Sequence, residues 1–67
     1  MNIELRFLEK AIIDKNYVSF FYEKKSIKKV KPLKLIVKED LYFLHTQDKT
    51  YEYKKIIKLQ ILKERFS

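Results

Sequence analysis

The chain contains no glycine, no cysteine and no tryptophan, and it has only one proline and one histidine. Without cysteine there is no disulfide and no thiolate zinc site, and His45 alone cannot build a histidine metal cluster. Without glycine, glycine-rich phosphate loops and the dinucleotide-binding fingerprint are excluded in their usual form. Turns with positive φ are then expected to rest on Asn or Asp, which tolerate that conformation best after glycine.

Long apolar runs and recognisable catalytic patterns are also missing. No segment approaches the ~18 continuous apolar residues of a membrane span. Glu4 and Glu9 interrupt the stretch where a signal peptide needs an apolar core. We therefore expect a cytoplasmic protein without a membrane partner. His45 has no serine in a nucleophile turn beside it, and the adjacent acids Glu39 and Asp40 are typical of a hairpin turn. We expect no enzyme and no cofactor.

The size and composition that are present indicate one small packed domain over residues 1–67. A chain of 67 residues buries only about 60% of the surface that its unfolded form exposes, so its stability is marginal. Hydrophobic residues make up 46% and aromatic residues 15% of the chain, which is too apolar for a disordered segment. Apolar packing is therefore the expected source of stability.

The net charge of +7 comes from one segment of the chain. Residues 24–38 hold seven lysines and no acid, whereas the remainder holds nine basic and nine acidic residues. Such a stripe attracts anions, most plausibly phosphates. The alternative is that these lysines only keep an exposed strand soluble and protect its edge from aggregation.

The spacing of apolar residues predicts an N-terminal helix followed by strands. From Leu5 to Ile12 they recur at helical intervals, which predicts a helix over residues 3–15 that Asn2 caps and Asn16 stops. Period-two alternation then predicts five strands, at residues 17–24, 26–38, 41–47, 50–54 and 57–64. Val18, Phe20 and Tyr22 are expected to share one face of the first strand, and Ile57, Leu59 and Ile61 are expected to face inward.

These elements predict an α+β, mainly β fold. We expect one long strand over 26–38, bent at Pro32, because proline lacks the amide donor of a central ladder. A helix followed by five short, hairpin-linked strands is typical of a small closed or half-closed barrel with the helix over one opening. Closure would also remove the exposed sheet edges that so short a chain could not cover.

Aromatic residues are unusually frequent, with five tyrosines and five phenylalanines. Aromatic rings between lysines can stack nucleic-acid bases while the ammonium groups meet phosphates. The alternative is structural, since a small barrel needs large side chains to fill it and tyrosine suits a barrel rim.

The central part of the chain resembles the WYL domain, a family named for a Trp-Tyr-Leu triplet that follows a proline-containing strand and a tight turn. Residues 31–44 match that order, with Leu41, Tyr42 and Phe43 at the triplet, so only its tyrosine is retained. The segment 18–22 resembles the first strand of the family, and residues 11–12 resemble the end of its leading helix.

Further along, residues 49–56 resemble the segment in which two arginines flank an aromatic strand. Lys49 and Lys55 stand at the arginine positions. The resemblance implies a Sm-like, SH3-like barrel and a sensory or regulatory role in bacterial transcription, often beside a helix-turn-helix or another effector domain. It also implies binding of nucleotides or single-stranded nucleic acid. Lysine lacks the planar fork with which arginine binds phosphate. If the resemblance holds, we expect the chain to be either a stand-alone module or an excised piece.

The sequence is compatible with two alternative functions. The first is a non-enzymatic domain that binds a nucleotide-like anion or single-stranded nucleic acid and modulates transcription. Its expected binding residues are Lys29, Lys31, Tyr42, Lys49, Tyr51, Tyr53 and Lys55. The second is a protein-interaction or homodimerisation module without a small ligand, suggested by the small size and by the strand at 41–46, which is apolar on both faces.

Overall fold

A computed structural model describes residues 3–66 of the chain, and the side chains of residues 4–66. It contains one α-helix, six strands and a short 3-10 helix, η1. In chain order they are α1 (Ile3–Asp14), β1 (Asn16–Tyr22), β2 (Lys25–Val30), β3 (Pro32–Lys38), β4 (Leu41–Thr46), β5 (Thr50–Glu52), η1 (Tyr53–Lys55) and β6 (Ile56–Arg65).

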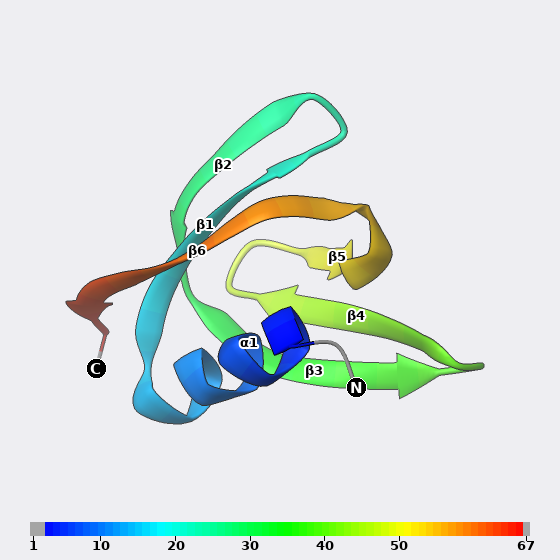
Figure 1. Ribbon diagram of the computed structural model, residues 1–67, viewed down its shortest axis with the longest axis horizontal. Coiled ribbons are helices and arrows are strands. Elements are labelled where there is room, and N and C mark those ends of the chain that lie inside the picture. Colours follow the sequence, from blue (N-terminus) through cyan, green and yellow to red (C-terminus); the bar gives the residue numbers. More distant parts are fainter. Residues whose placement is uncertain (1–2, 67) are drawn as a thin grey trace.

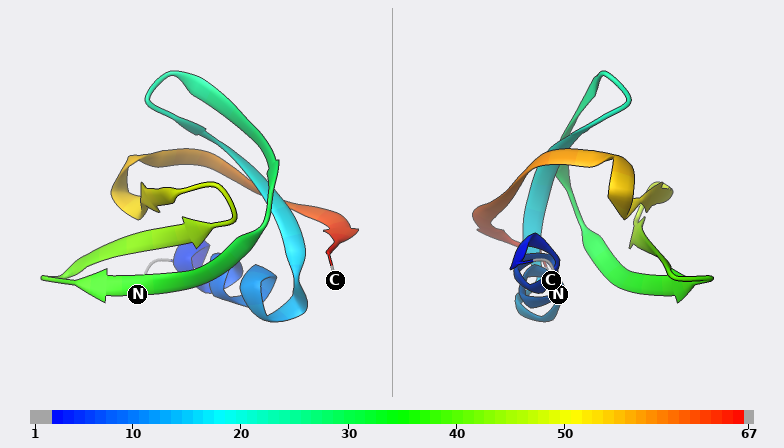
Figure 2. Two further views of the ribbon diagram at one scale, coloured as in Figure 1. Left: turned by 180° about the vertical axis from the view of Figure 1, so that it is seen from behind. Right: turned by 45° about the vertical axis from the view of Figure 1, so that its right-hand side comes forward.

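The strands form two antiparallel sheets, in the orders β2-β1-β6 and β3-β4-β5 (Figure 1). The predicted five-stranded barrel is therefore wrong: there are six strands, and neither three-stranded sheet closes on itself. The predicted strand over 26–38 is two strands, because the chain leaves the first sheet at Val30 and enters the second at Pro32 (Figure 2). Proline lacks the amide hydrogen needed to continue the first ladder.

The core lies between the two sheets and the helix. Helix α1 packs against β1, β3 and β6, so it contacts both sheets (Figure 1). Leu8, Val18, Phe20 and Leu44 are fully buried there. The ring of Tyr51 on β5 packs edge-on against Phe20, with the ring centroids 5.0 Å apart. This contact joins the second sheet to the first.

The helix lies close to its predicted range but ends differently. It stops at Asp14, and Lys15 rather than Asn16 has the left-handed backbone, with φ of 60°. Asn16 instead begins β1, and its side-chain amide donates a 3.1 Å hydrogen bond to the carbonyl of Leu62 on β6. The predicted cap, Asn2, lies outside the described residues.

Positive φ angles fall mostly on lysine and glutamate, so their predicted restriction to Asn or Asp is wrong. They are found at Lys15, Glu23, Lys24, Lys29, Glu39, Asp40 and Lys58. Glu23–Lys24 and Glu39–Asp40 are two-residue hairpin turns in which both residues have positive φ, which is the type I′ geometry. The twist of the flanking strands requires this turn whichever residues occupy it.

Replacing Lys24 with glycine is expected to stabilise the protein. The left-handed backbone of Lys24, with φ of 67°, costs an ordinary residue roughly 1–2 kcal/mol, of which glycine is free. Part of the gain is lost to the greater freedom of glycine in the unfolded chain. Urea unfolding of Lys24→Gly should therefore show a gain of about 1 kcal/mol. The control Lys25→Gly, on regular β2, should be destabilised, and equal losses in both variants would contradict the turn geometry.

The remaining two positive φ residues outside the turns, Lys29 on β2 and Lys58 on β6, lie where the pairing with β1 shifts register. At each place a step of two residues along β1 lies opposite a step of three residues along the outer strand. The outer strand therefore has one extra residue there, which is a β-bulge. The bulge at Lys58 changes the alternation of β6. Ile57 pairs with Phe21 and is 58% exposed, so its predicted inward orientation is wrong, and Ile56 is buried instead. Leu59 packs against the core as predicted, and Ile61 pairs with buried Val18 on the side of α1, although it stays 39% exposed.

Candidate functional site

A groove of about 360 Å³ crosses the outer face of the β2-β1-β6 sheet. All three strands contribute to it, and its lining combines small polar, aromatic and basic side chains. The lining residues are Ser19, Phe20, Phe21, Ser26, Lys28, Lys29, Lys58, Gln60 and Leu62.

The sequence of β1 explains the hollow. Val18 and Phe20 point into the core, so the alternation of the strand turns Tyr17, Ser19 and Phe21 to the outer face. Small Ser19 is paired with Gln60. The floor is therefore low between two aromatic positions, and hydroxyl and amide groups are available within it.

Each aromatic side chain on this face of β1 has an ammonium group over its ring. The Nζ atom of Lys58 lies 5.5 Å from the ring centroid of Phe21, and that of Lys29 lies 5.1 Å from the ring centroid of Tyr17. These two lysines are the residues with positive φ at the two bulges. Bulges re-aim side chains, and here both aim a lysine from an outer strand onto the central one.

A second aromatic ring lies against Tyr17, beside the groove. Phe66 contacts Tyr17 edge-on, with the ring centroids 5.5 Å apart. The Nζ atom of Lys31 lies 5.7 Å from the ring centroid of Phe66. The predicted residues Lys29 and Lys31 therefore do come together, at a pair of aromatic rings that the sequence analysis did not single out.

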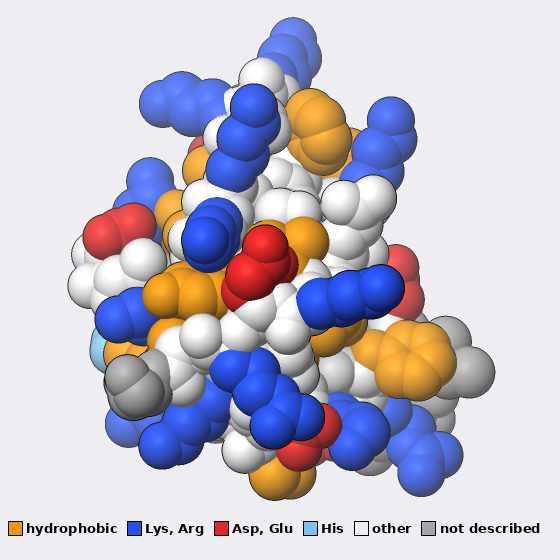
Figure 3. All heavy atoms as spheres, turned by 90° about the vertical axis from the view of Figure 1, so that its left-hand side faces the viewer, with side chains coloured by type: hydrophobic (Ala, Val, Ile, Leu, Met, Phe, Trp, Pro, Cys, Tyr) orange, Lys and Arg blue, Asp and Glu red, His pale blue; other side chains and the backbone are white. Residues whose placement is uncertain are grey.

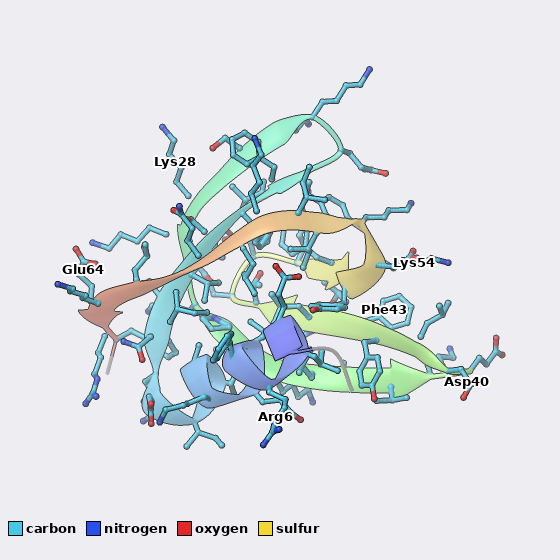
Figure 4. All side chains as sticks on the ribbon, in the orientation of Figure 1. Arg6, Lys28, Asp40, Phe43, Lys54 and Glu64 are labelled. Atoms are coloured by element: carbon cyan, nitrogen blue, oxygen red, sulfur yellow. The ribbon has the colours of Figure 1, made fainter. Side chains whose placement is uncertain are left out.

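The groove carries a clear electrostatic bias. Three lysines and no acid line it, so it favours an anion. Lys28 projects outward from β2 (Figure 4). Figure 3 shows lysine and arginine side chains spread over this side of the molecule, with hydrophobic side chains between them and fewer acids.

The predicted residues Lys49, Tyr51 and Lys55 lie elsewhere. The Nζ atom of Lys49 lies 5.3 Å from the ring centroid of Tyr51, whose ring contacts that of Tyr22 at 4.9 Å. However, Tyr51 is only 2% exposed, so its ring is not free to stack a base. Lys55 forms a 3.4 Å ion pair with Glu23, which raises the pKa of Lys55, first through the hydrogen bond and then through the opposite charge.

Tyr42 and Tyr53 meet in a different hollow, of about 500 Å³, beside the β3–β4 turn. Glu4 and Asp40 line it together with a single lysine, Lys54. Two carboxylates against one ammonium make it a poor site for an anion. Figure 4 shows Asp40 and Lys54 on the opposite side of the molecule from Lys28, so the two hollows are separate surfaces.

Burial of the tyrosines gives an expected pH dependence. Burial, and then the charge of Asp48, raises the pKa of Tyr51 above 10.0, and burial followed by Glu4 raises that of Tyr53. Above pH 10 the unfolded chain releases these phenolic protons before the folded one does. The resulting stability is complete below pH 10 and is lost as the pH rises through the higher folded values.

Urea unfolding on both sides of pH 10 measures this loss. Lysines also titrate in that range, so the readout is the difference between the wild type and Tyr51→Phe, which keeps the ring but has no phenolic proton. The variant should lose less stability with rising pH. Identical slopes for the two proteins would contradict the raised pKa of Tyr51.

Several residues of the groove are not among the binding residues predicted from the sequence. Phe21 could have been found, because three consecutive aromatic residues at 20–22 cannot all face the core of an alternating strand, and Phe21 is 41% exposed. Lys58 could not, since its position depends on a bulge with no glycine to mark it.

The aromatic–lysine pairs can exchange partners. An ammonium group over an exposed ring contributes about 0.5–1 kcal/mol, whereas a base stacked on an aromatic side chain contributes about 1–3 kcal/mol. A base can therefore take the ring face, and the displaced ammonium can move to the phosphate beside that base. The free protein thus keeps an ammonium group next to an aromatic ring at both positions.

Other kinds of site find no support within residues 3–66. No three histidine, cysteine or acidic residues of that range gather as metal ligands. In the same range, no helix is both long and apolar enough to cross a membrane. Comparison of the chain with protein-family models, curated proteins and solved structures finds no match.

Proposed function

We propose that the protein is a non-enzymatic binding domain for nucleic-acid-like anions, which it holds in the groove on the β2-β1-β6 sheet. The ligand is a nucleotide or single-stranded nucleic acid: phosphates meet Lys28, Lys29 and Lys58, and bases stack on Phe21 and Tyr17. The proposal is supported by Phe21 and the three lysines of one acid-free hollow, and by Tyr17, whose ring lies beside the hollow under Lys29.

The placement of Lys29 and Lys58 is the observation that carries the proposal. Both have a left-handed backbone, which costs an L-residue roughly 1–2 kcal/mol. A sheet that needed only curvature could have glycine at both bulges. Lysine at both, each over an aromatic ring of β1, is instead consistent with local strain retained at a functional site.

A regulatory role follows as part of the same proposal. The resemblance of residues 31–44 to the WYL domain suggests a module that reports a bound nucleic acid to an effector domain and so modulates transcription. The lysine-rich segment 24–38 contributes Lys28 and Lys29 to the groove and Lys31 beside it, so the charged stripe becomes part of the binding surface.

Fluorescence anisotropy with a labelled oligothymidylate tests the proposal. Binding is expected at low salt, and three lysine–phosphate contacts predict a slope of about −2 for log K against log salt, from about −0.7 per contact for single strands. Absence of binding at low salt for oligothymidylate, oligoadenylate and free nucleotides would end the proposal.

A second candidate function, self-association, has its own observation. Phe7 and Ile13 on the outer face of α1 are 55% and 78% exposed, and Phe7 shares a hollow of about 250 Å³ with Ile61 of β6. The surrounding charges on α1 are of both signs, from Arg6 and Lys10 to Glu9 and Asp14. Two copies of α1 packed antiparallel would place opposite charges together, which favours this contact between copies.

Light scattering over a wide concentration range tests that candidate. A second copy docked through α1 predicts a concentration-dependent dimer that Ile13→Lys abolishes, while the nucleic-acid groove stays intact. A strict monomer at every concentration would exclude this candidate and leave the binding function unaffected.

A further inference from the structure

Two aromatic side chains, Phe21 in the groove and Tyr17 beside it, lie at a fixed spacing on one strand. Tyr17 and Phe21 are four residues apart on the outer face of β1, which places them about 13 Å apart at the rise of a strand. The ammonium group of Lys29 lies over the ring of Tyr17, and that of Lys58 lies over the ring of Phe21. The outer face of the sheet therefore carries two separate aromatic–lysine units, one in the groove at Phe21 and one beside it at Tyr17. Ser19, which lines the groove, lies between the two rings along β1.

We infer that the ligand is a single strand of at least three nucleotides, with one base on Phe21 and another on Tyr17. This inference rests on the proposed function. A mononucleotide reaches only one ring at a time, whereas a short strand spans both. The intervening nucleotide lies over Ser19 and Gln60, whose hydroxyl and amide can hydrogen-bond to a sugar or a base edge.

The same geometry disfavours duplexes. In a duplex the bases are stacked on one another and present only their edges, so neither ring can receive a base face. A duplex can still meet the lysines through its phosphates. Single strands should consequently bind more tightly than duplexes of equal length and sequence.

The test is a length series of oligothymidylates from one to eight nucleotides, measured on the intact chain at constant salt. Affinity should rise roughly a hundredfold from one to four nucleotides, as expected when two linked sites are filled together, and then level off. Because charge also increases with length, an abasic tetramer with the same phosphates is the matched probe, and it should bind at least tenfold more weakly than the thymidylate tetramer.

Variants separate the two rings. Tyr17→Leu and Phe21→Leu keep every charge, so each should weaken the tetramer by about tenfold while leaving the mononucleotide within a few-fold. Phe7→Leu removes an exposed aromatic ring of α1, away from the groove, and should leave both affinities unchanged. Thermal unfolding verifies that each variant is folded, and the abasic comparison needs no variant.

The outcomes are distinct. Equal affinity for one and four nucleotides, for the abasic and the thymidylate tetramer, or for duplex and single strand would overturn the two-ring inference. The lysine–phosphate contacts of the proposed function would still stand, without base stacking on both rings. No binding of any probe at low salt would overturn the proposed function itself.

Discussion

Reversing the charge of Lys29 and Lys58 together is expected to abolish nucleic-acid binding at moderate salt. Hydrogen bonds to charged groups contribute about 1.5–3 kcal/mol each, so two lost contacts correspond to a loss of a hundredfold or more at low salt, and the introduced carboxylates repel phosphate further. The salt slope should flatten, because two of the three proposed phosphate contacts are gone. Anisotropy titrations of the Lys29→Glu/Lys58→Glu variant measure both effects.

The matched control reverses two lysines on the other sheet. Lys34 and Lys38 are exposed on β3 and do not line the groove. Lys34→Glu/Lys38→Glu therefore brings the same change in net charge, from +7 to +3, and should reduce affinity only through the weakened long-range field. If both double variants lose the same affinity at physiological salt, the groove is not the binding site and net charge alone explains binding.

Truncating Tyr51 to alanine is expected to unfold most of the protein. Tyr51 is 2% exposed and packs against Phe20 and Tyr22, and removing a buried aromatic ring costs about 3–5 kcal/mol. At about 0.05–0.15 kcal/mol per residue, the total stability of a chain of 67 residues is about 3–10 kcal/mol. The loss thus approaches the total, and circular dichroism with urea unfolding should show it directly.

Tyr51→Phe distinguishes a packing role from a binding role. It keeps the ring contacts, so it should fold and bind oligothymidylate like the wild type. A folded Tyr51→Phe variant that no longer bound oligothymidylate would place Tyr51 in the binding site, as the family resemblance suggests. A Tyr51→Ala variant of undiminished stability would mean that the two sheets do not depend on this ring.

Part of the architecture followed from local pattern. The helical spacing of Leu5 and Leu8 located α1, and strict alternation correctly placed Val18 and Phe20 in the core. These features depend on residues close in sequence, whose periodicity carries the information. The basic character of segment 24–38 was equally visible, since it needs only counting.

Tertiary contacts decided the remainder. The chain changes sheet at Pro32, and the bulges at Lys29 and Lys58 have no glycine to mark them. A bulge between two residues changes the face on which one lies relative to the other, which is why Ile57 faces outward while Leu59, on the other side of the bulge at Lys58, packs against the core. Long-range packing likewise buried Tyr51, although the sequence alone makes it as plausible a ligand contact as Phe21.

By itself, the sequence determined a basic, aromatic-rich chain that lacks the residues for disulfides and glycine phosphate loops. It also determined that Tyr17 and Phe21 lie on the same face of the first strand. Only the tertiary structure decided which rings meet which lysines. Strand pairing joins residues distant in the chain, and two bulges in the outer strands turn lysines onto Tyr17 and Phe21. Such a register depends on the fit of three strands at once, which no local pattern encodes.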